Sequence, residues 1–152
     1  KNAIISPSKL FLGGFTSKNN FESGKQYQKV SGINSGTIIN IDFIESLGGF
    51  DNKYPLDMLD HWYFREIYRG NKNVFLLDCE IYQNLSVSNN YEANMSVHRY
   101  IKFIEVEHYF FKSEHFMVFV SYKLRLFFRV LKQLNFKDST YYKRTLNKIF
   151  SF

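Results

Sequence analysis

The chain has 152 residues, of which 45% are hydrophobic and 19% aromatic, enough to bury a core and too many for a disordered chain. A single cysteine, Cys79, excludes an internal disulfide framework and favours a reducing compartment. The net charge is +6. No basic segment followed by an apolar one opens the chain, so we expect no secretion signal. Because the first residue is Lys1, we expect a chain that is either processed or cut from something longer.

The positive charge is concentrated toward the C-terminus. From His98 onward, eleven lysines and arginines outweigh four acidic residues, which gives +7. The remainder has nine basic and ten acidic residues, a balance of −1. A basic segment of this kind is typical of a surface that binds phosphate groups, either of nucleic acid or of anionic lipid.

The N-terminal part of the chain predicts a mixture of strands and helices. Residues 1–31 indicate a strand and a long polar loop, and the β-branched run 37–39 indicates a second strand. Helical spacing of apolar residues over 43–47, closed by a glycine, and again over 58–68 predicts two helices. The aromatic and β-branched run that follows the second helix predicts another strand.

The C-terminal part predicts helices over 100–111, 115–134 and 138–150. Lysine and arginine interrupt the longest apolar run before it reaches about 20 residues, so none of these helices is expected to span a bilayer. Lying on a membrane surface stays open. We expect the apolar faces of these helices to pack on the preceding part or on a partner, because faces this apolar would otherwise aggregate.

The stretch "GGFDNKYPLDMLDHWYFREIYRG" puts Asp57 and Asp60 three residues apart, beside several aromatic residues. Two interpretations are open. One aspartate caps the helix that follows, or the pair is a catalytic carboxylate and its support. The pair stands within an ordered series of features. A helix ends in Gly-Gly-Phe-Asp, a loop follows, and the acidic pair opens an amphipathic helix with Arg65 one turn further on. A helix cap alone would not require this arrangement, which favours the catalytic interpretation.

Taken in order, these segments resemble the acceptor-binding half of family 2 glycosyltransferases of the GT-A fold, especially the rhamnosyltransferase-like branch that builds cell-surface polysaccharides. The matching pieces are "NSGTIIN", "IESLGGFDNKYPLD" and "LDHWYFREIYRGNKNVFLLD". The resemblance covers roughly residues 3–86. The segment beginning "SVHRYIKFIEVEHYFF" is similar to the helical extension of such enzymes.

The resemblance implies an α/β fold in which residues 1–90 are the C-terminal, acceptor-side part of a GT-A domain. This part would hold a short mixed sheet with flanking helices, and residues 91–152 would form a helical tail. It also implies an inverting transfer of a sugar from a nucleotide-sugar donor to a polysaccharide or lipid-linked acceptor. In such a transfer a carboxylate removes the proton from the attacking hydroxyl.

Asp60 matches the family's general base best, and Asp57 is the reserve. The residues that would line the acceptor side are Ser35, Gly36, His61, Trp62 and Arg65. Core packing is the alternative interpretation of the tryptophan, and a surface position that of the histidine.

Two departures from the family pattern bear on these roles. Leu59 stands where the family has a glutamate, and the step from Asp60 to Arg65 is one residue shorter than usual, so either aspartate of the pair can be the base. Gln83 stands where the family often has a histidine that helps to hold the metal or diphosphate. We therefore expect no metal ligand in this chain.

The family's nucleotide-binding half, with its Asp-x-Asp motif and a divalent Mg²⁺ or Mn²⁺, has no counterpart here. We expect that half to be supplied in cis or in trans, and this chain alone to be inactive and to bind no cofactor.

The predicted helix 115–134 places Arg125, Arg129 and Lys132 at i, i+4 and i+7, on one face. Each basic residue near an anionic leaflet contributes about 1 kcal/mol of attraction. We therefore expect these three residues to contact a membrane or a partner, and the full enzyme to be cytoplasmic and peripherally bound to the inner face of a bacterial membrane. In the alternative interpretation the helices only close the core or a dimer interface.

Two rival interpretations make the chain a non-catalytic module. In one, the basic and aromatic tail grips RNA or DNA through phosphate contacts and base stacking, with nucleic acid the less favoured partner. In the other, the tail docks on a partner protein, as a structural part of a split transferase.

Overall fold

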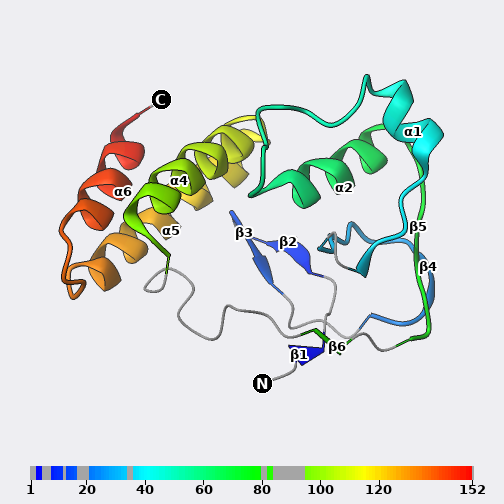
Figure 1. Cartoon of the computed structure of the whole chain (residues 1–152), viewed down its shortest axis with the longest axis horizontal. Helices are drawn as coiled ribbons and strands as arrows, with labels where there is room; N and C mark the ends of the chain where they lie inside the picture. Colours follow the sequence, from blue (N-terminus) through cyan, green and yellow to red (C-terminus); the bar gives the residue numbers. More distant parts are fainter. Residues whose placement is uncertain are drawn as a thin grey trace. The chain divides into compact units, whose positions relative to one another are not determined.

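The structure is a computed structural model that describes residues 3–4, 8–11, 13–16, 21–33, 36–79, 82–83 and 95–151. Figure 1 labels its helices and strands. The chain divides into two compact units. Unit 1 comprises Lys1–Phe11 and Phe15–Leu85, and unit 2 comprises Leu12–Gly14 and Ser86–Phe152. Each unit is described by itself below.

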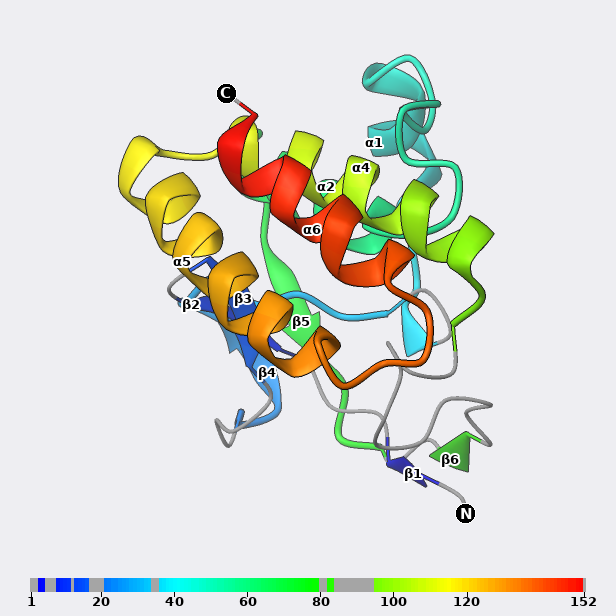
Figure 2. The same ribbon diagram turned by 90° about the vertical axis from the view of Figure 1, so that its left-hand side faces the viewer.

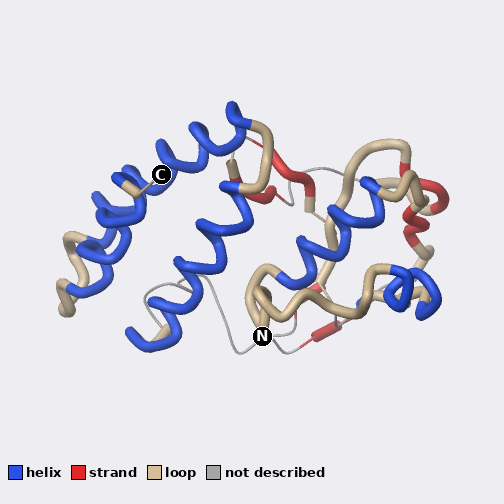
Figure 3. Tube along the Cα trace, turned by 90° about the horizontal axis from the view of Figure 1, so that it is seen from above, coloured by secondary structure: helices blue, strands red, loops and turns tan. Residues whose placement is uncertain are grey.

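The described strands are all very short and form three separate two-stranded pairs. They are β1 (Ala3–Ile4) with β6 (Tyr82–Gln83), β2 (Lys9–Phe11) with β3 (Gly14–Thr16), and β4 (Gly24–Gln26) with β5 (Val74–Leu76). The first and the last of these pairs are antiparallel. The fold is thus mixed α/β, as predicted, but the expected single mixed sheet is wrong for the described part of the chain. Figure 3 colours the strands red and shows how short each of them is.

One predicted strand and one predicted loop are also wrong. Residues 37–39 lie in no strand, and the Ile38 side chain is 87% exposed, so the β-branched run has no packed surface to stabilise an extended ladder. Strand β4, in contrast, falls within the polar stretch that was expected to be a loop. The predicted strand after the second helix is confirmed as β5.

Both predicted helices of unit 1 are present. Helix α1 is Ile41–Ser46, and the Asn40 side chain caps it by accepting a hydrogen bond from the Phe43 backbone N–H at 2.8 Å. It is followed by Gly48 and Gly49, with φ of +81° and +94°, conformations that glycine adopts without steric cost.

Helix α2 is Leu59–Arg69 and forms the centre of the unit 1 core. Its buried residues are Trp62, Tyr63, Phe64 and Ile67, and they are joined in the core by Val30, Ile44 and Tyr54. The far end of α2 is tied to the chain by the Tyr68 hydroxyl, which accepts from the Val30 N–H at 2.8 Å and donates to its carbonyl at 3.1 Å.

Unit 2 is a bundle of the three predicted helices, α4 (Val97–Lys112), α5 (Phe116–Gln133) and α6 (Thr140–Phe150). Helix α6 packs against both other helices, as Figure 2 shows. The core between them is aromatic and aliphatic, made by Tyr100, Ile104, Phe110, Phe111, Tyr122 and Leu126. In the part of the chain that the structure describes, no helix is both long enough and apolar enough to cross a bilayer.

Gly13 and Gly14 belong to unit 2 and lie against α5. Gly13 has φ of +70°, and a Cβ atom there would lie 2.2 Å from the backbone nitrogen of Tyr122. A side chain at this position would meet fixed helix backbone, so only glycine fits.

Candidate functional site

The two candidate carboxylates flank the start of helix α2. Asp60 lies in the first helical turn and Asp57 in the loop that precedes the helix, and both are half-buried. The N-cap residue is Met58, so neither aspartate occupies the N-cap position. A carboxylate in the first turn of a helix lies close to the positive end of the helix dipole.

Met58 lies between the two aspartates in a strained backbone conformation. Its φ of 66° and ψ of −2° are in the left-handed region, which is uncommon for a long side chain. Such a conformation costs on the order of 1 to 3 kcal/mol and persists only where the surrounding structure enforces it. Met58 is the residue at which the chain turns into α2, with Asp57 directly before it and Asp60 two residues after it.

His61 follows the second aspartate but its ring lies in the interior. The imidazole stacks on Phe15, with ring centroids 3.4 Å apart and an interplanar angle of 8°. Its Nδ1 atom lies 2.7 Å from the Ser31 hydroxyl. Burial lowers the pKa of His61 to about 4, so the ring is neutral at pH 7. The structure thus gives this histidine a packing and hydrogen-bonding role rather than a surface position.

Trp62 is a core residue. It is 7% exposed and packs against Tyr54 and Phe50, with both ring centroids at 6.3 Å. The alternative interpretation of this tryptophan as core packing is the one that the geometry favours.

Arg65 is held by its neighbours on and near α2. Its Nε donates to Glu66 Oε1 at 3.1 Å, and its side chain is 13% exposed. Burial alone would lower the pKa of Arg65, but the nearby Tyr54 and Glu66 side chains outweigh this effect and raise that pKa. The guanidinium therefore stays charged.

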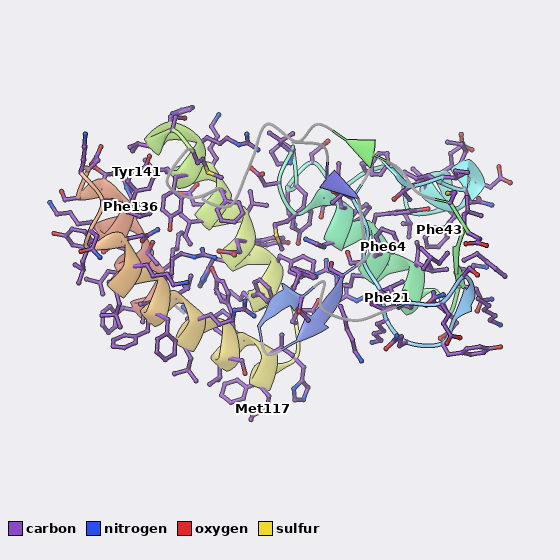
Figure 4. The ribbon with its side chains drawn as sticks, turned by 90° about the horizontal axis from the view of Figure 1, so that it is seen from below. Phe21, Phe43, Phe64, Met117, Phe136 and Tyr141 are labelled. Atoms are coloured by element: carbon purple, nitrogen blue, oxygen red, sulfur yellow. The ribbon has the colours of Figure 1, made fainter. Side chains whose placement is uncertain are left out.

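A cavity of about 1130 Å³ lies in unit 1, and Gly36 is the one predicted site residue among the described residues that line it. Ring side chains from Phe43, Tyr63 and Phe64 line it, and Figure 4 labels the first and last of these. Its polar lining includes Gln26, Asn40, Asp42, Ser46, Lys72 and Asn73. The sequence analysis gave these rings no site role, because no local signal distinguishes a ring that lines a cavity from one that is packed on all sides.

The cavity includes Gly36 but not the carboxylate pair. Ser35, its predicted neighbour, lies outside the described residues. Asp57 and Asp60 are not among the described residues that line the cavity. Phe64 does line it, and it follows Asp60 by four residues on α2, so the two side chains share one helix face. The cavity wall thus begins one helical turn from the candidate base.

The three residues of the predicted basic face, Arg125, Arg129 and Lys132, have different surroundings in the bundle of unit 2. Arg129 donates to both carboxylate oxygens of Glu107, at 2.6 and 2.9 Å, and this pair is largely buried. The guanidinium of Arg125 lies against Gly14, and only Lys132 and part of Arg125 remain exposed. Arg129 therefore acts inside unit 2 rather than on the surface expected from its helical spacing.

Within the described ranges, no group of three or more His, Cys, Asp or Glu side chains is placed to hold a metal ion. Comparisons with protein-family models, with curated proteins and with solved structures found no match. The likeness to family 2 glycosyltransferases therefore rests on the ordered sequence segments alone.

Proposed function

We propose that this chain is the acceptor-side part of an inverting glycosyltransferase, in which a carboxylate at the start of α2 is the general base. The observation that carries the proposal is the strained Met58 between Asp57 and Asp60. Backbone strain of this kind gathers at functional sites, where it orients reacting groups. Two of the segments that resemble the family, residues 44–57 and 59–78, adjoin along the sequence at this helix start.

The chemistry required of this carboxylate is modest. The base accepts the proton of an acceptor hydroxyl while that oxygen attacks the anomeric carbon of the donor, and the nucleoside diphosphate leaves. The hydroxyl becomes acidic only as the new bond forms, so an ionised carboxylate of ordinary basicity is sufficient. Asp60 is our first candidate for this base because it lies in the first turn of α2, and Asp57 is the second.

The cavity beside α2 suits a saccharide acceptor. Aromatic faces bind the apolar side of a sugar ring, and amide, hydroxyl and carboxylate groups bind its hydroxyls. Phe43, Tyr63 and Phe64 supply the rings, and Asn40 and Asp42 supply polar groups. We assign the body of a polysaccharide or lipid-linked acceptor to this cavity, with its reacting hydroxyl toward Asp60.

The proposal requires a second component for the donor. The described strands form only two-stranded pairs, which are marginal by themselves and leave edges that another segment can pair with. We propose that the nucleotide-binding half, with a divalent metal, completes the enzyme in cis or in trans. The exposed thiol of Cys79 fits the reducing cytoplasm as the place where this happens.

Reconstitution tests the proposal. The chain is combined with a nucleotide-binding half, fused or as a separate polypeptide, and incubated with a panel of nucleotide sugars and saccharide acceptors. Sugar transfer that requires both halves is expected. Transfer by the nucleotide-binding half alone, or no transfer from any donor by a complex that forms, would contradict the assignment.

A further inference from the structure

Helix α5 exposes a continuous line of large apolar side chains along the surface of unit 2. These side chains, each between 48% and 63% exposed, are Met117, Leu124, Phe127, Phe128, Leu131 and Leu134, and we call them the α5 apolar stripe. Met117, labelled in Figure 4, points away from the bundle. The stripe extends over the whole helix and ends at its C-cap, Leu134.

The stripe is separate from the face with which α5 packs into its own unit. Met117, Leu124 and Leu131 are spaced seven apart, so they lie in one row along the helix. The packed face carries Tyr122 and Leu126, which are at most 1% exposed. A helix buried on one side usually presents polar residues on the other. Here both sides are apolar, and an exposed apolar patch of this size marks an interaction site.

The charged residues of α5 itself are all positive. Helix α5 contains Lys123, Arg125, Arg129 and Lys132 and no acidic residue. Lys123 donates to the carbonyls of Lys148 and Ser151 at the end of α6, and Arg129 is taken by Glu107. Lys132 is exposed at one edge of the stripe, as is part of Arg125, whose guanidinium lies against Gly14. A partner that covers the stripe therefore meets an apolar surface with a cationic edge.

An apolar stripe with a cationic edge favours an anionic bilayer over a second copy of the chain as the surface that covers it. A second copy of the chain would bring two cationic edges together without an acidic residue of α5 between them, which is unfavourable. A bilayer with anionic headgroups suits both parts of this surface, since acyl chains surround the apolar side chains and lipid phosphates attract Lys132 at the edge.

We propose that the α5 apolar stripe docks unit 2 in the plane of an anionic membrane surface. Met117, Leu124, Phe127, Phe128, Leu131 and Leu134 insert at the boundary between headgroups and acyl chains, and Lys132 contacts the phosphates. Helix α5 is 18 residues long and lies along the surface. The bundle of unit 2 orients it. This inference is independent of the transferase proposal, because it uses only unit 2.

Vesicle flotation of the purified chain is the test. One set of vesicles contains phosphatidylcholine alone, and the other contains equal parts of phosphatidylcholine and phosphatidylglycerol. Binding to the anionic vesicles is expected, with a partition coefficient at least tenfold higher than for the neutral ones. The substitution Lys132→Gln should lower anionic binding roughly fivefold, and added salt should lower it further.

The apolar part is tested by a pair of leucines. The double substitution Leu124→Gln and Leu131→Gln should reduce binding to anionic vesicles roughly tenfold or more, since each side chain loses its apolar insertion. The matched control is Ile38→Gln with Leu56→Gln, two side chains of unit 1 that are 87% and 66% exposed. This control should bind as the unaltered chain does, and circular dichroism verifies that both variants keep their helix content.

Three results would overturn the proposal. One is equal binding to neutral and anionic vesicles, and another is full binding by the leucine variant. The third is an absence of binding to either vesicle. In that case, sedimentation that shows a concentration-dependent dimer, abolished by Leu124→Gln with Leu131→Gln, would identify a second copy of the chain as the occupant of the stripe.

Discussion

The ion pair between Glu107 and Arg129 provides a sharp test of the unit 2 structure. Two charge-assisted hydrogen bonds of 2.6 and 2.9 Å join the side chains, which are 10% and 17% exposed. The guanidinium also lies 5.7 Å from the ring centre of Phe103. We predict that Arg129→Met, which keeps an apolar stem but removes the charge, strongly destabilises unit 2.

The size of the effect follows from burial. An exposed ion pair contributes up to about 1 kcal/mol, whereas removing one partner of a buried pair costs about 3 to 5 kcal/mol because the other charge stays uncompensated. With both side chains less than one-fifth exposed, we expect Arg129→Met to cost about 3 kcal/mol. Lys132→Met is the matched control on the same helix, and it should change the free energy of unfolding by less than about 0.5 kcal/mol because Lys132 is exposed.

Urea unfolding followed by helical circular dichroism measures both variants. Adding Glu107→Gln to Arg129→Met should cost less than the sum of the two single substitutions, by about 2 kcal/mol, because the pair acts as a unit. If Arg129→Met were no more destabilising than Lys132→Met, the buried pair would not be present and Arg129 would belong on the surface.

Two further predictions concern the cores of the units. Burial lowers the pKa of His61 to about 4, and burial followed by the charges of Lys123, Lys148 and Lys112 does the same for His108. The unfolded chain therefore binds more protons than the folded chain below pH 6.5. The free energy of unfolding should fall between pH 6.5 and pH 4, by at most about 3 kcal/mol for each histidine, and it should fall less in His61→Asn or His108→Asn. Equal pH dependence in either variant and in the unaltered chain would refute the burial of that histidine. Gly13→Ala should lower the free energy of unfolding by more than about 3 kcal/mol, since the new Cβ would meet the backbone of α5. The control Gly24→Ala, where φ is +100° and the space is open, should lower it by about 1 kcal/mol. Equal thermal stability of the two variants would show that the contact between Gly13 and α5 does not form.

The helices were the part of the fold that the sequence could predict. Periodic apolar residues over 11 to 18 positions define α2, α4, α5 and α6, because the spacing is a local property of each segment. The sheet was not predictable in the same way. The pairing of β4 with β5 joins segments far apart in the chain, and β4 consists of the polar residues Gly24–Gln26, which carry no strand pattern.

In the candidate site, too, the local features could be predicted from the sequence and the tertiary contacts could not. The sequence located the acidic pair at the start of α2 correctly, but the burial of His61 depends on Phe15 and Ser31, which approach it only in the folded chain. Helical spacing grouped Arg129 with two exposed basic residues. Arg129 is instead paired with Glu107 of helix α4, a contact that the sequence of α5 alone does not reveal.

The proposed function rests most directly on the role of Asp60. In the reconstituted enzyme, Asp60→Asn should lower kcat at least roughly 100-fold, the effect typical of losing a general base, with little change in thermal stability. Glu105→Gln is the matched control, because this carboxylate is exposed and belongs to α4 in unit 2, and it should leave turnover unchanged. A large loss with Asp57→Asn in place of Asp60→Asn would move the base to the other member of the pair. Full activity in both single variants and in the double variant would contradict the assignment of catalysis to this helix start.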